Sequence, residues 1–233
     1  MIYNNEFIAP VLTRKTMDRY FHRVAIYQVV EEITPYLNGT LLDAGCGQMP
    51  YRSFILNNSN VTDYVGLDIE TAINYSDEVK PDVTWNGKVM PFDDNSFECV
   101  MATEVLEHVP DTINYLNEVY RVLKPGGTFF FTTPFLWPLH EVPHDEYRFT
   151  PFAMKRLLLK ANFNNVEIQP LGGWHASLAQ MLGLWLKRGP IPSKKRKILT
   201  ILFFPFYKYL IKKDRKVIYN SDMITGLWGS VRK

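Results

Sequence analysis

The sequence has only two cysteines and no long apolar run. Cys46 lies in a glycine-rich turn and Cys99 in an expected strand, so they form neither a metal-spaced pair nor a disulfide framework. No apolar stretch reaches the length that a helix needs to cross a bilayer. The first residues, Met-Ile-Tyr-Asn-Asn-Glu, lack the basic-then-apolar order of a signal peptide. We therefore expect a cytoplasmic protein with reduced thiols.

Acidic residues are scarce near the C-terminal end. Residues 187–216 contain eleven of the 26 Lys and Arg but only Asp214 of the 24 acids. The rest of the chain, with 15 basic and 23 acidic residues, carries a charge of −8. At 233 residues, 46% of them hydrophobic and 21% charged, the chain fits one globular α/β domain with an insertion.

The stretch Leu41–Gln48 predicts a buried strand that runs into a glycine turn and the start of a helix. Gly45 and Gly47 allow a sharp bend and let a ligand lie against the main chain. Asp43, at the carboxyl end of the strand, can accept hydrogen bonds from an ammonium or amide group held there. A dinucleotide-binding turn needs a third glycine where Pro50 stands, and a phosphate-binding loop needs Gly-Lys-Ser/Thr, which is absent.

Alternating elements follow this turn. Hydrophobic periodicity and turn residues predict helices over 13–34, over 51–56, after a cap at Asp111 and after a cap at Thr150. The expected further strands are 61–68, 81–85, 97–102, 128–133, 166–169 and 223–231.

The Asp-x-Gly-x-Gly turn resembles the first motif of the class I S-adenosylmethionine-dependent methyltransferases. The later order of strand, loop, helix, Leu-Lys-Pro-Gly-Gly and strand resembles the small-molecule, type 11-like branch of that family, over about Thr40 to Asn165. The resemblance implies a Rossmann-like, doubly wound, seven-stranded sheet, mostly parallel with an antiparallel last strand. It also implies S-adenosyl-L-methionine as cofactor, its amino-acid end wrapped by the loop Asp43, Gly45, Cys46 and Gly47.

Four further residues complete the expected cofactor site. Asp68 ends the second strand at the distance at which an acid meets ribose hydroxyls, although a helix cap or a turn acid fits the same position. Ile69 beside it is an expected apolar contact for adenine. Asn86 stands where the family often has an Asp that binds the adenine amine, and a plain loop asparagine is the alternative. The resemblance places Glu104 near the sulfur and carboxyl ends of the cofactor.

Glu104, Glu107 and His108 would share one face of a helix. The same pattern binds a divalent metal in some RNA 3′-end and ubiquinone-precursor methyltransferases, whereas ordinary members carry it without metal. We therefore assign no metal ligands from the sequence. An RNA methyltransferase with a divalent metal is an alternative function.

The loop 134–149 concentrates candidate acceptor-side groups. His140 and His144 are the expected general bases for a sugar or phenol hydroxyl. Asp145 or Glu146 would fix the imidazole and Arg148 would hold an anionic acceptor; alternatively, Arg148 pairs with one of these acids and only braces the loop. The stretch resembles a sub-branch associated with cell-surface glycan or lipid-linked saccharide pathways.

We divide the chain into an N-terminal helical segment (1–39), a cofactor-binding core (40–170), a basic helical insertion (171–221) and the final strand (222–233). In the insertion, Ser193 is the expected cap of a helix from Lys194 to Lys213 that Pro205 kinks. Residues 194–216 fit an interfacial helix on an anionic membrane, or a helix pair packed over the pocket with its lysines in water. No nucleic-acid-binding module accompanies this charge.

Taken together, the sequence predicts a class I methyltransferase that acts on a small-molecule or lipid-linked acceptor, with oxygen the favoured atom. It would be cytoplasmic, with peripheral contact at the inner face of the membrane. A cofactor-binding scaffold without turnover is an alternative from a different functional class. The residue Pro50 disfavours a nicotinamide dehydrogenase.

Overall fold

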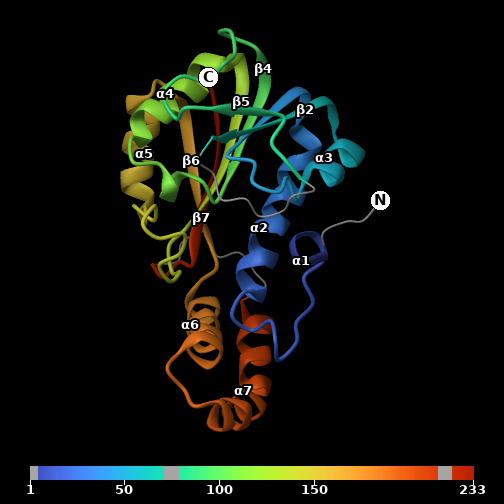
Figure 1. Cartoon of the computed structure of the whole chain (residues 1–233), viewed down its shortest axis with the longest axis vertical. Coiled ribbons are helices and arrows are strands. Elements are labelled where there is room, and N and C mark those ends of the chain that lie inside the picture. Colours follow the sequence, from blue (N-terminus) through green and yellow to red (C-terminus); the bar gives the residue numbers. More distant parts are fainter. Residues whose placement is uncertain (1–4, 71–78, 215–221) are drawn as a thin grey trace.

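The computed structural model describes residues 5–70, 79–214 and 222–233, which are drawn as coloured ribbon in Figure 1. A seven-stranded sheet has the order β3-β2-β1-β4-β5-β7-β6. Strands β1 to β5 are parallel, and β7 runs antiparallel to both β5 and β6. The expected doubly wound, mostly parallel sheet is therefore confirmed. The strands are β1 Asn38–Ala44, β2 Asn60–Ile69, β3 Val83–Trp85, β4 Phe97–Thr103, β5 Leu123–Pro134, β6 Asn164–Leu171 and β7 Gly226–Arg232.

The central strands are apolar on both faces because helices cover both sides of the sheet. Alternate side chains point to opposite faces, so Leu41 and Leu42 enter different halves of the core. Leu41 belongs to the core cluster that includes residues of α2, α3, α6 and α7, whereas Leu42 belongs to the cluster that includes residues of α4 and α5. The helices are α1 Asn5–Ile8, α2 Tyr20–Ile33, α3 Arg52–Asn58, α4 Thr112–Val122, α5 Pro151–Lys160, α6 Trp174–Arg188 and α7 Ser193–Lys213, with short 3-10 turns η1 Thr34–Tyr36 and η2 Leu106–His108.

Two of the expected helix caps are confirmed and one is wrong. The Asp111 carboxylate accepts the backbone N–H of Asn114, and the Thr150 hydroxyl accepts that of Ala153. In contrast, Ser193 is the first helical residue of α7, and the capping position belongs to Pro192, whose side chain offers no acceptor.

The helix expected over 13–34 is α2, and it begins at Tyr20 instead of residue 13. The Thr16 hydroxyl donates to the carbonyl of Val11 and accepts the backbone N–H of Thr13. Such local side-chain bonds offer the backbone an alternative to helical pairing. At the other end of the chain, the last strand starts at Gly226 and not at residue 223.

Helices α6 and α7 lie between β6 and β7 in the sequence and form a helical lobe below the sheet in Figure 1, toward which α2 extends. Tyr207 of α7 is fully buried. Gly183 of α6 lies against the segment that precedes α2, since a Cβ added at Gly183 would stand 2.1 Å from the carbonyl oxygen of Met17. No helix in the described part of the chain is both long and apolar enough to cross a bilayer. Of the predicted basic segment 194–216, Arg215 and Lys216 lie outside the described residues.

Candidate functional site

The carboxyl end of β1 forms a tight bend that is tied to β2. The backbone N–H groups of Gly45 and Cys46 both donate to the carbonyl of Leu67, at 2.7 and 3.0 Å. Gly45 has a φ of +94°, and a Cβ there would stand 2.5 Å from Cγ1 of Val105. Glycine is therefore required at this position for both conformation and space.

Asp68 faces this bend from the end of β2. Its Oδ2 accepts the backbone N–H of Gly47 at 2.9 Å, and its Oδ1 accepts that of Ile69 at 2.8 Å. Each carboxylate oxygen retains a further lone pair that a ribose hydroxyl could use. Ile69 is 40% exposed just beyond it. The structure thus brings together the glycine bend, Asp68 and Ile69, as the predicted cofactor site requires.

Asp43 is buried directly behind the bend. The hydroxyl of Tyr64 donates to its Oδ2 at 2.5 Å, whereas Oδ1 has no hydrogen-bond partner among the described residues. Burial raises the pKa of Asp43 to about 7, against the opposing effect of the Tyr64 hydrogen bond. An orphaned, buried carboxylate oxygen suits a ligand that brings a positive charge or an N–H donor.

Two other predicted cofactor residues make different contacts. Oδ1 of Asn86 accepts the backbone N–H groups of Lys88 and Val89, at 2.9 and 3.3 Å, in a turn of its own. Its role toward adenine stays a prediction. Cys46 contributes its backbone N–H to the bend, and burial raises the pKa of its thiol, which keeps the thiol protonated.

The expectation that Glu104, Glu107 and His108 share a helical face is wrong. Glu104 has a φ of +56° and only the short turn η2 follows it, so the spacing of three and four residues does not align the side chains. Instead, the carboxylate of Glu104 contacts Nε2 of His22 at 3.0 Å and the hydroxyl of Thr132 at 2.8 Å. Burial alone would raise the pKa of Glu104, but His22 and Thr132 outweigh it and hold that pKa below its ordinary value.

The residue that sequence reasoning missed here is His22. It lies on the buried face of α2 and stacks on Trp137, with ring centroids 4.3 Å apart. A histidine within the apolar stripe of an amphipathic helix was the available signal, because a buried polar ring needs a partner.

The two predicted bases in the loop after β5, His140 and His144, have different surroundings. Nδ1 of His140 lies 3.2 Å from Oδ2 of Asp145, and the guanidinium of Arg148 binds both oxygens of Asp145, at 2.6 and 2.8 Å. The Arg148 hydrogen bonds hold the pKa of Asp145 well below its usual range. His144, in contrast, has an exposed side chain, and its carbonyl accepts from Nδ1 of His108 at 3.0 Å. Arg148 therefore braces the loop, which was the alternative reading.

Burial lowers the pKa of His140, and the neighbouring His108 lowers it further. Both rings stand beside Glu107, which is fully buried. Burial, followed by the nearby charge of Glu104, raises the pKa of Glu107 well above its ordinary value.

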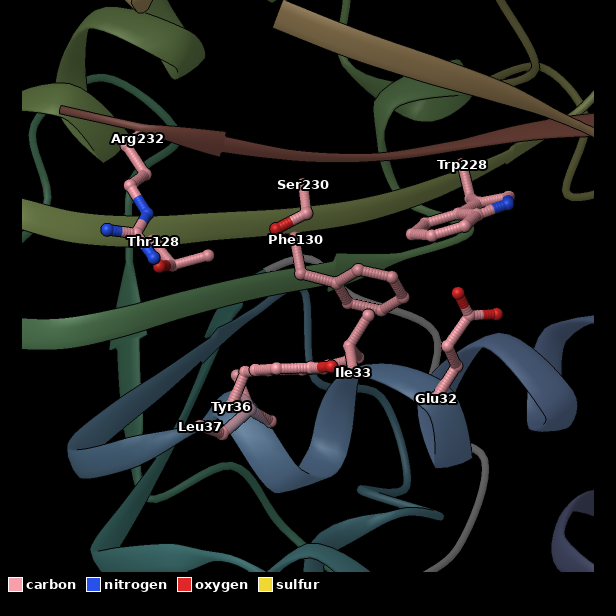
Figure 2. Close-up of a pocket in the computed structure, with 9 residues that line it drawn as sticks. All are labelled: Glu32, Ile33, Tyr36, Leu37, Thr128, Phe130, Trp228, Ser230 and Arg232. Atoms are coloured by element: carbon pink, nitrogen blue, oxygen red, sulfur yellow. The ribbon is translucent and has the colours of Figure 1, made fainter. Parts of the chain in front are cut away.

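A separate hollow of about 220 Å³ lies between α2, η1, β5 and β7. Figure 2 shows Trp228, Phe130 and Glu32 around it, with Thr128 and Arg232 at its other end. Thr128 lies in the amino-terminal half of β5, away from the carboxyl ends that carry the predicted site residues. This hollow is therefore not the predicted cofactor site.

Residues 42–131 match the family described as "Methyltransferase domain". Among curated proteins, the chain is 35% identical over 95 residues to the mitochondrial 2-methoxy-6-polyprenyl-1,4-benzoquinol methylase of Dictyostelium discoideum, covering 38% of this chain and 30% of that protein. It is 33% identical over 129 residues to cycloartenol-C-24-methyltransferase 1 of Oryza sativa, covering 50% and 35%. The chain thus matches about a third of the length of these relatives.

Solved structures agree on the fold. A S-adenosylmethionine-dependent methyltransferase from Archaeoglobus fulgidus superposes with a TM-score of 0.58 at 15% identity, covering 94% of this chain and 97% of that one. Phosphoethanolamine N-methyltransferase 2 of Haemonchus contortus, solved with S-adenosyl-L-methionine, gives 0.57 at 14% identity, covering 100% and 60%. Together with the family match, these neighbours identify the chain as carrying the class I methyltransferase fold.

Proposed function

We propose, from the premise that residues 42–131 form a methyltransferase domain, that the chain transfers the methyl group of S-adenosylmethionine to a small-molecule or lipid-linked acceptor. One observation carries the cofactor assignment. The Asp68 carboxylate faces the Gly45–Gly47 bend, and behind it stands a buried oxygen of Asp43 that has no hydrogen-bond partner among the described residues. This combination offers acceptors for a sugar diol and for an ammonium group at two ends of one bend.

The cofactor would supply a methyl group that its sulfonium charge already activates. This chain's residues would then align the acceptor, exclude water and, for a hydroxyl acceptor, take up a proton. In the proposed arrangement Asp68 binds the ribose hydroxyls, Ile69 lies against adenine and Asn86 lies at the adenine edge. The amino-acid end lies along the bend, beside Asp43, Gly45, Cys46, Gly47 and Glu104.

The acceptor side would come from the loop after β5, which leaves the same end of the sheet. We assign the proton-accepting role to a histidine of this loop, His140 or His144, for an oxygen acceptor. Asp145 holds the ring of His140 and is itself held by Arg148. His140 is thereby the better oriented of the two.

The helical lobe supports a lipidic acceptor. It exposes large apolar side chains next to lysines, a combination that suits the interface of an anionic membrane. The exposed residues include Trp174 at 68%, Ile198 at 66% and Leu202 at 66%. The two curated relatives named above are, by their names, methyltransferases of a polyprenyl quinol and of cycloartenol, both apolar molecules. We therefore propose peripheral membrane contact through residues 194–214.

The test uses methyl-labelled S-adenosylmethionine with separate lipid, saccharide-lipid, small-metabolite and RNA fractions. We expect label in a lipid or small-molecule fraction with the wild-type protein, and strongly reduced label with Asp68→Ala. Mass spectrometry of the product then identifies the methylated atom. Cofactor binding without label in any fraction would favour the non-catalytic scaffold, and label in RNA alone would contradict the acceptor class.

Membrane contact has its own test. Flotation with vesicles of phosphatidylglycerol should carry the protein upward, and vesicles of phosphatidylcholine should not. Replacing Lys194, Lys195 and Lys197 together by Glu should abolish flotation, whereas the triple Gln variant should only weaken it. Equal flotation with both vesicle types would overturn the electrostatic part of this proposal.

A further inference from the structure

Helix α6 turns an apolar face toward solvent. Four of its large side chains are substantially exposed: Trp174 at 68%, Leu178 at 51%, Met181 at 49% and Trp185 at 45%. Their spacings of four, three and four residues place them in one row along the helix. Residues 174–186 contain no lysine, arginine, aspartate or glutamate. This row, the α6 stripe, therefore has no charged neighbour from the same stretch of helix.

The polar side chains of α6 lie on the opposite face. Ser177 and Gln180 are buried, on the side where Gly183 packs closely against Met17. A surface helix of a water-soluble domain normally has the reverse arrangement, with apolar residues inside and polar residues outside. Removing exposed apolar side chains from water is favourable, so the outer face of α6 calls for an apolar partner.

Helix α7 turns its outer face away from the same segment of the chain. A Cβ added at Gly183 would stand 2.1 Å from the carbonyl oxygen of Met17 and 3.2 Å from Cε2 of Tyr207, which is a buried residue of α7. Both helices thus direct their buried faces toward the segment around Met17. Their outer faces consequently both point away from it and belong to the outer surface of the helical lobe.

A basic cluster lies at the carboxyl-terminal end of the α6 stripe. The guanidinium of Arg196, in the first turn of α7, donates to the carbonyl of Gly189, the residue after α6, at 2.9 Å. This contact holds the first turn of α7 against the end of α6. The cluster consists of three exposed lysines in that turn, Lys194, Lys195 and Lys197. An apolar row bordered by lysines is complementary to an anionic bilayer, which offers acyl chains beneath negative headgroups.

A second copy of the chain suits this surface less well. It would carry the same basic cluster, and like charges oppose association. The stripe is also small for a stable dimer. A large aromatic side chain buries about 150–250 Å², so these four partly exposed side chains offer roughly 400–500 Å², whereas a stable interface buries about 800 Å² per partner.

We propose that the α6 stripe inserts into the acyl-chain layer of an anionic membrane, while the basic cluster binds the headgroups. This inference rests on the peripheral contact proposed above and adds an inserted surface that lies outside residues 194–214. Helix α6 then lies along the membrane plane, with its stripe buried about 5–10 Å deep. Trp174 and Trp185 stand at the two ends of the stripe, and tryptophan is enriched where headgroups meet acyl chains.

Insertion of α6 brings the acceptor side of the site to the membrane surface. Arg188, the last residue of α6, lies over the ring of Trp137 in the loop after β5, at 5.1 Å. Strand β6 runs in the same direction as β5, because both are antiparallel to β7, so α6 begins at the carboxyl edge of the sheet. The acceptor class that suits this arrangement is a lipid whose tail stays in the bilayer while its head group reaches the loop.

Tryptophan fluorescence with phosphatidylglycerol vesicles tests the insertion. Bromine atoms on the acyl chains quench only those tryptophans that reach the chains. We expect brominated chains to lower the fluorescence of the wild-type protein, and the double variant Trp174→Phe, Trp185→Phe to lose this quenching. Leu178→Glu should lower vesicle affinity at least about 10-fold, because it replaces an inserted leucine by a charge. Phe152→Glu, which makes the same charge change at an exposed position of α5, is the matched control and should bind as wild type.

The outcomes separate insertion from its alternatives. Equal fluorescence of the wild-type protein with brominated and plain chains overturns insertion, even where flotation shows that the protein binds the vesicles. Self-association in lipid-free buffer that Leu178→Glu abolishes, measured by sedimentation, assigns the stripe to a second copy and likewise overturns it. Thermal melting checks folding, and Leu178→Glu should melt as wild type because the position is at the surface.

Titration with S-adenosylmethionine on the same samples separates this inference from the proposed methyl transfer. Leu178→Glu should bind the cofactor as the wild-type protein does, because the α6 stripe lies outside the cofactor side. Quenching by brominated chains without cofactor binding in the wild-type protein overturns the methyl transfer alone. Cofactor binding without quenching overturns the insertion alone.

Discussion

The two halves of the candidate site are built in different ways. The cofactor half comprises Asp43, Gly45, Gly47 and Asp68. The bend after β1 is tied to the end of β2 by backbone hydrogen bonds to Leu67 and by the Asp68 carboxylate. In the acceptor half, which comprises η2 and the loop 135–149, side chains contact side chains across two separate loops. The cofactor half therefore depends on strand order and glycine geometry, and the acceptor half depends on a few charged and imidazole groups.

The largest effect should come from the glycine bend. In Gly45→Ala, a positive φ costs about 1–2 kcal/mol and overpacking against Val105 about 1–3 more. Gly126→Ala is the matched control, because Gly126 has a φ of +79° but nothing within 4 Å of its Cβ position. Urea unfolding should show a larger loss of unfolding free energy in Gly45→Ala than in Gly126→Ala. Gly45→Ala should also lose S-adenosylmethionine binding. Equal losses for the two variants would mean that close approach at the bend does not matter.

The second largest effect should be a dependence of stability on pH through Asp43 of the cofactor half. The Asp43 carboxyl ionises near its ordinary value in the unfolded chain and at about 7 in the folded one, so between these values the folded state binds more protons. The contribution of Asp43 to the free energy of unfolding should therefore fall as pH rises from about 5 to 7, by up to about 1.4 kcal/mol per pH unit. Urea unfolding of wild type and Asp43→Asn at several pH values measures this difference. A variant that follows the wild-type profile throughout would contradict the buried-acid interpretation.

Cofactor affinity is the third comparison. Asp68→Ala should weaken S-adenosylmethionine binding by about 10- to 100-fold, because it removes the proposed acceptor for the diol and the partner of the Gly47 N–H. Asp63→Ala, which changes an exposed acid of the same strand, should leave the affinity unchanged. Calorimetry with S-adenosylmethionine and with its demethylated product measures both. An unchanged affinity in Asp68→Ala would separate Asp68 from the cofactor.

The smallest effect should come from the brace of the acceptor half. Arg148→Lys replaces a two-pronged contact with Asp145 by a single one, at a cost of about 1 kcal/mol. Arg156→Lys, at an exposed position of α5, should cost nothing measurable. Thermal unfolding reports stability, and nuclear magnetic resonance of His140 reports the looser ring. A His140 signal that does not change would show that Arg148 does not act through Asp145.

The geometry of the cofactor half could be predicted from sequence patterns because it depends on residues that are close together in the chain. A strand, two glycines and an acid at the end of the next strand specify the bend and the position of Asp68. The seven-stranded, mostly parallel sheet was implied by the resemblance to the class I methyltransferases, and the structure confirms it. The boundary at Tyr20 was missed because the hydroxyls of Thr13 and Thr16 form hydrogen bonds with backbone groups before the helix begins.

The side-chain contacts of the acceptor half could not be predicted from the sequence. The spacing of Glu104, Glu107 and His108 suggested one helical face, but spacing does not reveal that Glu104 adopts a positive φ. The approach of His140 to Glu107 and of His22 to Glu104 depends on how a loop and a distant helix dock. No local pattern specifies such contacts, because they are set by tertiary packing.

One helix connects both halves to the helical lobe. From α2, His22 reaches Glu104 and stacks on Trp137, while Asp18 just before it binds Arg188 of α6 at 2.9 Å. Arg188 also lies over the ring of Trp137, at 5.1 Å. A displacement of α2 would consequently be transmitted to the cofactor side, the acceptor side and the lobe in a single movement. The position of α2 therefore fixes the candidate cofactor side, the candidate acceptor side and the lobe relative to one another.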